Sequence, residues 1–363
     1  MSPYKKNFNR RDFLKLSGGA LGLSALSFYA GYASQPQPFA LTNSVAYVDD
    51  LSPLPVFRAP YLQHQVQMAA FLFGADLDQL TLLCDRYLNI PTQGQLKYVP
   101  LMANLVLTYS DMLISSLDER DAGVGSLRET EIAFWIPTMA MRKVGGTYVP
   151  QHLAWFLPTL FVDDSCAIAS GREVYGFNKQ WGKFERPDLI EDPHLSASVM
   201  GFSHFGPDVV GSLQPLLQLR KSQTQPMQPT QPANNWTDWE SARKELSANL
   251  LQSAQANPAA PLVEIAARLA TEPMPLVFLK QFRDAVDSRQ ACYQAIVQAH
   301  MHVTDFKSGG FLPARYELEL NQLESHPLNK NLGLPSGSQP ASLGVWMQLS
   351  FNLGQAEEVY RAG

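Results

Sequence analysis

The chain has 363 residues, of which 45% are hydrophobic and 17% are charged, a composition typical of a folded globular protein and unlike that of a disordered one. Its 33 acidic residues outnumber its 28 basic ones, and this excludes the basic surface on which nucleic-acid binding depends. The three cysteines, at positions 84, 166 and 292, have no metal-ligand spacing and allow at most one disulfide.

The N-terminus matches a twin-arginine export signal. Arg10 and Arg11 lie in a basic region, and Phe13-Leu14-Lys15 follows them. The apolar stretch that comes next, Leu16–Ala30, is short for a membrane span, and small residues after it suit cleavage. We therefore expect residues 1–33 to be a signal peptide that takes the folded protein through the twin-arginine translocation machinery to the periplasm. An uncleaved anchor and an amphipathic first helix are the alternatives.

Residues 34–56 are rich in proline, serine and glutamine and predict an extended arm ahead of one domain at 57–363. Near the start of this domain, Asp76 is expected to cap a helix that begins at Leu77. Apolar and β-branched runs bounded by turn residues predict strands in the rest of its first half. These expected strands are residues 66–74, 99–109, 131–141 and 153–162.

The segment 187–288 is expected to be a helical insertion. After a run of glutamine, proline and threonine at 222–232, Thr237-Asp238-Trp239-Glu240 forms a capping box. The apolar stripe behind it predicts a helix that ends before Pro258, and a second helix is expected at 262–270.

Beyond the insertion the hydrophobic pattern has a period of two from Tyr293 to Val303, which is typical of a strand. Residues 315–323 and 343–353 predict further strands, and 355–361 a short terminal helix. Many strands with few helices between them favour an α+β fold with an antiparallel β-barrel-like core and peripheral helices over a doubly wound fold.

The segment from Gly171 to Trp181 contains the strongest chemical signal. If its second half is extended, the alternation of side chains puts Tyr175, Phe177, Lys179 and Trp181 on one face. Aromatic neighbours keep water from an amine and so favour its neutral, nucleophilic form. The structural alternative is a lysine whose stem covers aromatic surface while its ammonium reaches water.

Gly171-Arg172-Glu173 followed by Phe177-Asn178-Lys179 resembles the Schiff-base lysine segment of the acetoacetate decarboxylase family. The resemblance extends in family order over Arg58 to Arg361, apart from the insertion. The further segments that carry it are Arg58-Ala59-Pro60-Tyr61, Asp76-Leu77-Asp78-Gln79-Leu80, Glu131 with Ile136-Pro137, Val303-Thr304-Asp305-Phe306 and Ala314-Arg315-Tyr316-Glu317-Leu318.

The resemblance implies a barrel-like fold and a catalytic pair, Lys179 and Glu131. Lys179 would attack the ketone of a small keto acid substrate and form an iminium ion, which accepts the electron pair released when CO₂ leaves. Glu131 would orient the substrate or handle protons on the enamine. The protein is thus expected to be a carboxy-lyase or to catalyse a related C–C cleavage.

Four positions depart from the family's pattern. Asn178 replaces its proline, Gln180 its second lysine and Val66 an arginine of its pocket, while its other pocket glutamate aligns near Leu105–Leu107, where there is no carboxylate. Valine cannot replace the bidentate recognition of a carboxylate by arginine. These departures leave a second hypothesis open, a non-catalytic small-molecule binding protein on the same barrel fold.

We expect no cofactor and no metal ion. The sequence has no phosphate-binding glycine motif and no Gly-x-Ser-x-Gly elbow. His300 and His302 have a spacing at which two side chains of one strand could share a metal, but no third ligand follows at a suggestive spacing. No nucleic-acid partner is expected, and a homo-oligomer is left open.

Overall fold

The computed structural model describes residues 46–48, 56–222, 235–253 and 274–362. Contacts divide the chain into residues 1–47 and 48–363, and everything described below belongs to the second unit. The expected signal peptide, most of the expected arm and the helix expected at 262–270 lie outside the described residues and stay predictions. No helix of the described part has both the length and the apolar character to cross a membrane.

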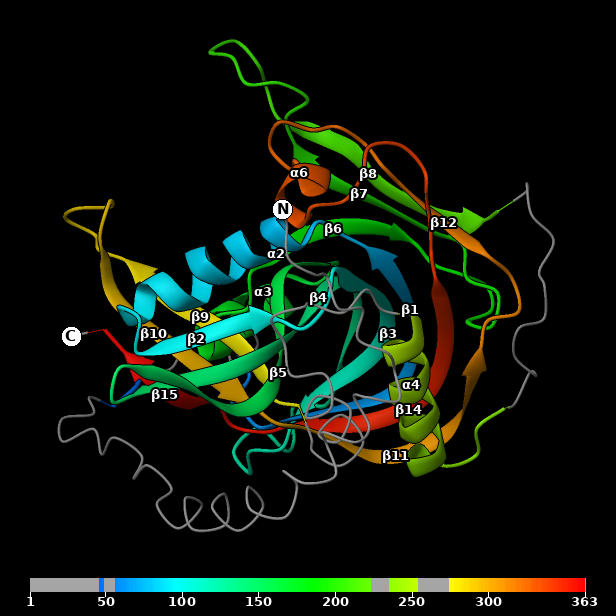
Figure 1. Ribbon diagram of the computed structural model, residues 1–363, viewed down its shortest axis with the longest axis horizontal. Helices are drawn as coiled ribbons and strands as arrows, with labels where there is room; N and C mark the ends of the chain where they lie inside the picture. The colour runs from blue at the N-terminus through cyan, green and yellow to red at the C-terminus, as the bar shows by residue number, and fades with distance from the viewer. Residues whose placement is uncertain (1–45, 49–55, 223–234, 254–273, 363) are drawn as a thin grey trace, which may run out of the picture. The chain divides into compact units, whose positions relative to one another are not determined.

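Fifteen strands of the described residues form one connected, strongly curved sheet (Figure 1). They are β1 (Tyr61–Gly74), β2 (Leu96–Pro100), β3 (Asn104–Ser116), β4 (Leu127–Val144), β5 (Thr147–Val162), β6 (Lys179–Glu185), β7 (Leu195–Gly201), β8 (Ser212–Lys221), β9 (Leu276–Arg283), β10 (Ala291–Ala299), β11 (Met301–Phe311), β12 (Tyr316–Leu320), β13 (Gln339–Pro340), β14 (Leu343–Leu353) and β15 (Glu357–Arg361).

The main order in the sheet is β11-β14-β1-β3-β4-β5-β6-β7-β8-β12-β13, with β2 on β4 and with β9, β10 and β15 attached through β5. The pairs are antiparallel except β5 with β6 and β5 with β9. Among the described residues the helices are few: α2 (Leu77–Cys84), α3 (Ser165–Ser170), α4 (Trp239–Ser253) and α6 (Leu328–Leu332), with single π or 3₁₀ turns after α2 and α3. The expected α+β fold with an antiparallel, barrel-like core is confirmed.

Aspartate side chains cap α2 and α4, at α2 as the sequence predicts and at α4 one residue after Thr237, the first residue of the expected capping box. Asp76 accepts a hydrogen bond from the backbone N–H of Gln79 at 3.0 Å, which confirms the predicted start of α2. At α4 the capping side chain is Asp238, which accepts from Ser241 N at 2.9 Å. The apolar stripe of α4 packs on the sheet, where the Trp239 ring lies 6.0 Å from that of Phe306 on β11.

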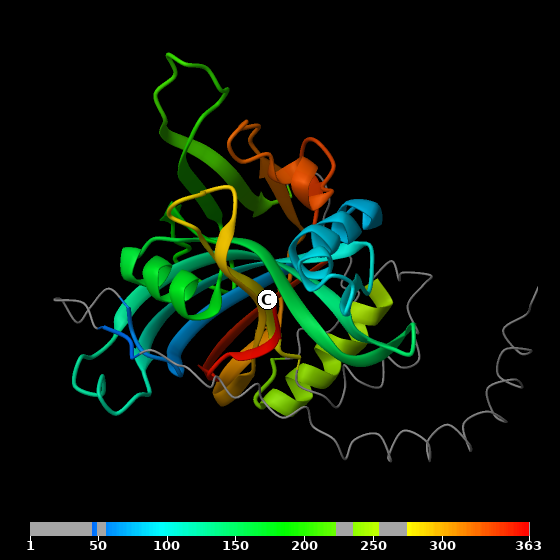
Figure 2. The same ribbon diagram turned by 90° about the vertical axis from the view of Figure 1, so that its left-hand side faces the viewer.

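The expectation of a helical insertion at 187–288 is wrong for most of its described part. Besides α4, this segment contains the three strands β7, β8 and β9. Leu195, Ala197 and Val199 alternate with more exposed residues, and this period of two lets β7 extend the sheet from β6 toward β8. In Figure 2, β7 and β8 stand above the curved part of the sheet.

Two shorter predictions are also wrong. Residues 165–175 are helical, with α3 capped by Asp164, which accepts from Ala167 N at 2.7 Å, and the extended backbone begins only at Lys179. The chain turns between the two at Gly176, whose φ of +83° is in the left-handed region, so Tyr175 is not on the strand of Lys179. Trp181, two residues after Lys179 on β6, is 40% exposed, whereas Lys179 is buried. The expected terminal helix at 355–361 is β15, which pairs with β10.

Candidate active site

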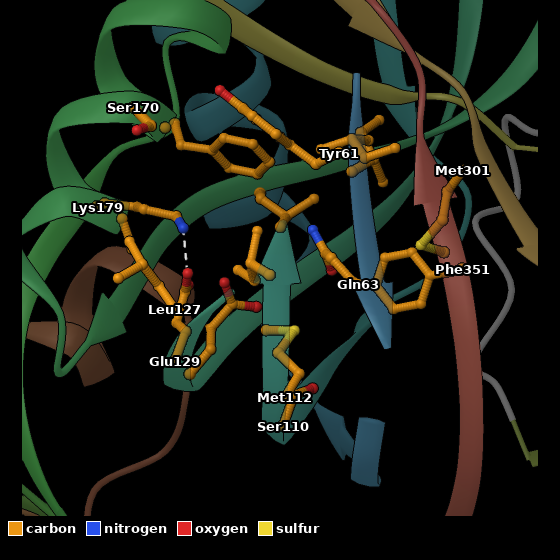
Figure 3. Close-up of a pocket in the computed structure, with 18 of the residues that line it drawn as sticks. Tyr61, Gln63, Ser110, Met112, Leu127, Glu129, Ser170, Lys179, Met301 and Phe351 are labelled. Atoms are coloured by element: carbon orange, nitrogen blue, oxygen red, sulfur yellow. Dashed lines mark hydrogen bonds and ion pairs between the residues drawn. The ribbon is translucent and has the colours of Figure 1, made fainter. Parts of the chain in front are cut away.

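An enclosed cavity of about 60 Å³ lies inside the curve of the sheet, several times the ~10–15 Å³ that one water molecule requires. Side chains from β1, β3, β4, β11 and β14 form its apolar walls, and α3 with the start of β6 closes one side (Figure 3). Tyr61, Met112, Leu127, Met301 and Phe351 are among the wall residues. The charged residue types in this apolar cavity are Lys179, Glu129 and Glu131.

Lys179 is buried and forms an ion pair with Glu129. Its Nζ donates a hydrogen bond to Glu129 Oε1 at 2.7 Å, and the two side chains are 8% and 1% exposed. The Nζ also lies 5.5 Å from the centroid of the Phe177 ring, a cation–π contact. Because water is nearly excluded, a proton can move from the ammonium to this carboxylate without leaving separated charges in a medium of low dielectric constant.

The backbone before β6 directs Lys179 into the cavity. Asn178, at the position of the family's proline, donates from Nδ2 to Pro158 O at 2.9 Å and so ties this backbone to β5. Arg172 donates from Nη1 to the carbonyl oxygen of Lys179 at 3.3 Å, and Lys179 itself pairs with Leu160 in the parallel register of β5 and β6. These contacts fix the backbone position of Lys179, which is the first residue of β6.

Gly171 leaves the space that the stem of Lys179 occupies. A Cβ at this position would lie 2.8 Å from Lys179 Cδ and 2.9 Å from Cε. Gly171→Ala is expected to move Nζ away from Glu129 and to slow the reductive alkylation of Lys179 by a small ketone about 10–100-fold, the range for a misplacement near 1 Å. Peptide mapping by mass spectrometry after a timed reaction measures this rate.

Gly74→Ala is the matched control, since an added Cβ at Gly74 meets nothing within 4 Å. If Gly171→Ala and Gly74→Ala react at the same rate, the stem of Lys179 does not depend on the space beside Gly171.

Glu131 lies two residues after Glu129 on β4, so both carboxyl groups face the cavity. The pKa of Glu131 is raised from 4.5 to about 8, mainly by burial; Lys179 acts in the opposite direction, and the adjacent Glu129 adds to the rise. A protonated Glu131 donates to Glu129, whose Oε2 is otherwise buried without a donor among the described residues. The site thus holds one ion pair and one neutral acid at pH 7.

Of the sequence-predicted site residues, Lys179 and Glu131 lie in the same cavity. Glu129, the direct partner of Lys179, is not among the site residues that the sequence predicted. The spacing of the two glutamates on a predicted strand was the available signal, because residues i and i+2 of a strand share a face. The cavity's second carboxyl group therefore comes from β4, the strand of Glu131.

The other departures from the family's pattern lie outside the cavity. Gln180 points to the opposite side of β6, where its Oε1 is 2.8 Å from His326 Nε2. Val66 follows a bulge in β1 between Gln63 and Val66, at which Gln65 has a φ of +53°. It packs in the core with Met112 and Val345, on the same face of β1 as Gln63 and Met68, but Gln63 and Met68 are the residues of this face that line the cavity.

No cluster of three or more His, Cys, Asp or Glu side chains suited to a metal ion occurs in the described part of the chain. The rings of His300 and His302 stack with their centroids 6.1 Å apart. A larger cavity of about 500 Å³ lies between α4 and the sheet, and its charged groups, Glu240 and Arg243, are on the exposed side of the helix. It offers no buried nucleophile.

No family model matches this sequence, and neither does any curated protein. Among solved structures, acetoacetate decarboxylase from Legionella pneumophila aligns over 89% of this chain and 94% of its own, with 13% identity and a TM-score of 0.53. The enduracididine biosynthesis enzyme MppR in complex with pyruvate aligns over 84% and 92%, with 12% identity and a TM-score of 0.48. An acetoacetate decarboxylase-like enzyme from Sphingomonas wittichii RW1 aligns over 83% and 93%, with 13% identity and a TM-score of 0.46. The extent of the first alignment shows that this chain has the fold of acetoacetate decarboxylase.

Proposed function

We propose that this protein is an enzyme that forms a Schiff base between Lys179 and a small carbonyl substrate and uses it to break a C–C bond, as in decarboxylation or a retro-aldol step. The observation that carries the proposal is the buried lysine in an enclosed cavity, with a carboxylate 2.7 Å from its Nζ and a second carboxyl group beside it. The fold, on which known decarboxylases are built, is compatible with this chemistry but does not by itself establish it.

The reaction begins when Glu129 takes the proton of the Lys179 ammonium. The neutral amine attacks the carbonyl carbon, and loss of water from the carbinolamine gives an iminium ion. The electron pair of the bond that breaks flows into the iminium and leaves an enamine. A carboxyl group of the pair, Glu131 or the protonated Glu129, then protonates the enamine carbon, and water hydrolyses the new iminium to release the product and the lysine.

The second candidate is a non-catalytic binding protein on the same fold. The short Lys179–Glu129 ion pair favours it, because an ammonium held in that state does not attack a carbonyl. The two functions differ in one observable property, the formation of a covalent bond at Lys179.

Borohydride trapping tests the proposal. The protein is incubated with a panel of ketones and of 2- and 3-keto acids, reduced, digested and mapped by mass spectrometry. We expect a reduced adduct on Lys179 with at least one compound and none in Lys179→Gln, because only an iminium at this amine is reducible to a stable secondary amine.

Lys280 is the matched control. It also lies against aromatic rings, 5.5 Å from the centroid of Tyr293, and burial lowers its pKa, yet it is not part of the cavity. Lys280→Gln is expected to leave the adduct on Lys179 unchanged. No adduct on Lys179 with any compound, in protein whose circular dichroism shows it to be folded, would establish the binding protein instead.

A further inference from the structure

We propose that the substrate of this site is an uncharged carbonyl compound, a β-hydroxy ketone that is cleaved by a retro-aldol step, and not a keto acid. The inference rests on the proposed function, since it concerns what Lys179 reacts with. It differs from what the resemblance to acetoacetate decarboxylases implies, and it is carried by the charges and hydrogen-bonding groups of the cavity wall.

The charges in the cavity balance without a substrate carboxylate. Among the described residues that line it, Lys179 is the sole cation, and Glu129 pairs with it. When Lys179 becomes an iminium, its positive charge stays on the same nitrogen and Glu129 still neutralises it. A substrate carboxylate would add a negative charge beside Glu129 with no cation left to pair with it, and burying an unpaired charge is unfavourable.

The arginines nearest to the site are engaged elsewhere. Arg58 pairs with Asp121, and Arg172 donates to the backbone carbonyl of Lys179. Arg186 donates to Thr130 Oγ1 and to Asp163 Oδ2, each at 2.9 Å. None of the three is among the residues that line the cavity, and position 66 is a valine. The described structure therefore has no group that could recognise a carboxylate as a bidentate arginine does.

The wall provides neutral hydrogen-bonding groups in place of a cation. Gln63 from β1 points its amide into the cavity (Figure 3), and Ser110 from β3 also lines it. Neither side chain is used in a hydrogen bond to another described side chain or backbone group, so both can bind the oxygen of a carbonyl or hydroxyl group. The methionine and phenylalanine side chains around them suit short alkyl substituents.

The two carboxyl groups fit a retro-aldol step. Once the ketone of the substrate is an iminium on Lys179, an ionised carboxylate of the pair removes the proton of the β-hydroxyl group. The bond between the α- and β-carbons breaks, its electron pair forms the enamine, and the β-carbon leaves as an aldehyde or ketone. The proton then passes to the enamine carbon, and hydrolysis by water releases the second product. Every proton is returned, and no further reactant is needed.

Acetoacetamide and acetoacetate form the matched pair for the test, because they are nearly the same in shape and differ in charge. Each is incubated with the full-length protein and borohydride, and adducts on Lys179 are quantified over time at pH 7. We expect acetoacetamide to label Lys179 at least about tenfold faster, equivalent to ~1.4 kcal/mol. In Gln63→Arg, which adds a cation to the wall, the ratio is expected to shift toward acetoacetate.

Arg268 provides a further control, since it is the one basic residue of the sequence after position 48 that lies outside the described residues. Arg268→Gln is expected to leave the ratio unchanged. Labelling by acetoacetate that equals or exceeds labelling by acetoacetamide would overturn the inference and leave the Schiff base standing, and so would a preference that changes in Arg268→Gln. Labelling of Lys179 by neither compound nor by any member of the panel would overturn the proposed function itself.

Discussion

Replacing both carboxyl groups of the cavity, Glu129→Gln together with Glu131→Gln, is expected to lower the free energy of unfolding by about 3–5 kcal/mol at pH 7. In this variant Lys179, whose side chain is 8% exposed, is a buried cation without a counter-charge. Glu129→Gln alone is expected to cost less, because Glu131 already interacts with Lys179 and can ionise to replace the lost partner once Glu129 no longer raises its pKa. Urea denaturation followed by circular dichroism measures both losses.

An exposed ion pair is the control for this prediction. Glu240 and Arg243 on α4 are 2.8 Å apart, close to the 2.7 Å of the buried pair, but the Glu240 side chain is 75% exposed. Glu240→Gln is therefore expected to change the stability by less than about 0.5 kcal/mol. Adding Lys179→Met to the double variant is expected to recover most of the loss, because a methionine buries no charge. A double variant as stable as the unaltered protein would contradict the buried position of Lys179.

The free energy of unfolding of the unaltered protein is expected to fall as pH rises from about 4.5 to about 8, and in Glu131→Gln this fall is expected to be absent. In the folded protein, burial and the neighbouring Glu129 raise the pKa of Glu131 to about 8, whereas in the unfolded chain it returns to 4.5. Over this interval the folded state keeps a proton that the unfolded state has lost. The free energy of unfolding therefore falls as pH rises, by up to ~1.4 kcal/mol per pH unit. The contribution is fully present below pH 4.5 and is lost above pH 8.

Denaturant unfolding of both proteins at pH 5, 6, 7 and 8 measures this effect, because the difference between them cancels the groups they share. The difference in free energy of unfolding, unaltered protein minus Glu131→Gln, is expected to be largest at pH 5 and to decrease steadily to pH 8. A difference that is constant over the four pH values would mean that Glu131 titrates normally. The same property matters for catalysis, since it makes Glu131 a proton donor at neutral pH.

Local rules in the sequence were enough for much of the architecture. The side chain of Asp76 caps α2 as its position before an apolar helical pattern predicts, because a capping bond joins residues only three apart. The expected strands 66–74, 131–141 and 153–162 became β1, β4 and β5 with boundaries that moved by a few residues, whereas the strand expected at 99–109 is divided between β2 and β3. The extended backbone considered from Tyr175 begins only at Lys179, since a short apolar segment with glycine fits a strand and a helix equally well until its neighbours are known.

The candidate site was predicted in part. Lys179 stood out through its aromatic and glycine neighbours and through a resemblance, and Glu131 through that resemblance alone. Glu129 did not stand out in the sequence, because its role depends on its contact with Lys179, a residue 50 positions away. This contact forms only when β4 and β6 lie on either side of β5. The absence of an arginine at position 66 was visible in the sequence. The bulge in β1 at Gln65 was not, because it depends on how β1 pairs with β3 and β14.

The sequence by itself determined the class of fold, the helix caps and the residue types from which a lysine site can be built, because these follow from hydrophobic period and from bonds between near neighbours. Only the tertiary structure decided the state of those residues. Curving the sheet around Lys179, Glu129 and Glu131 removes their water, and burial is what raises the pKa of Glu131 and makes a carboxylate the necessary partner of the lysine. Whether a cavity accepts a charged or a neutral substrate is likewise a property of the side chains that distant strands bring to one wall.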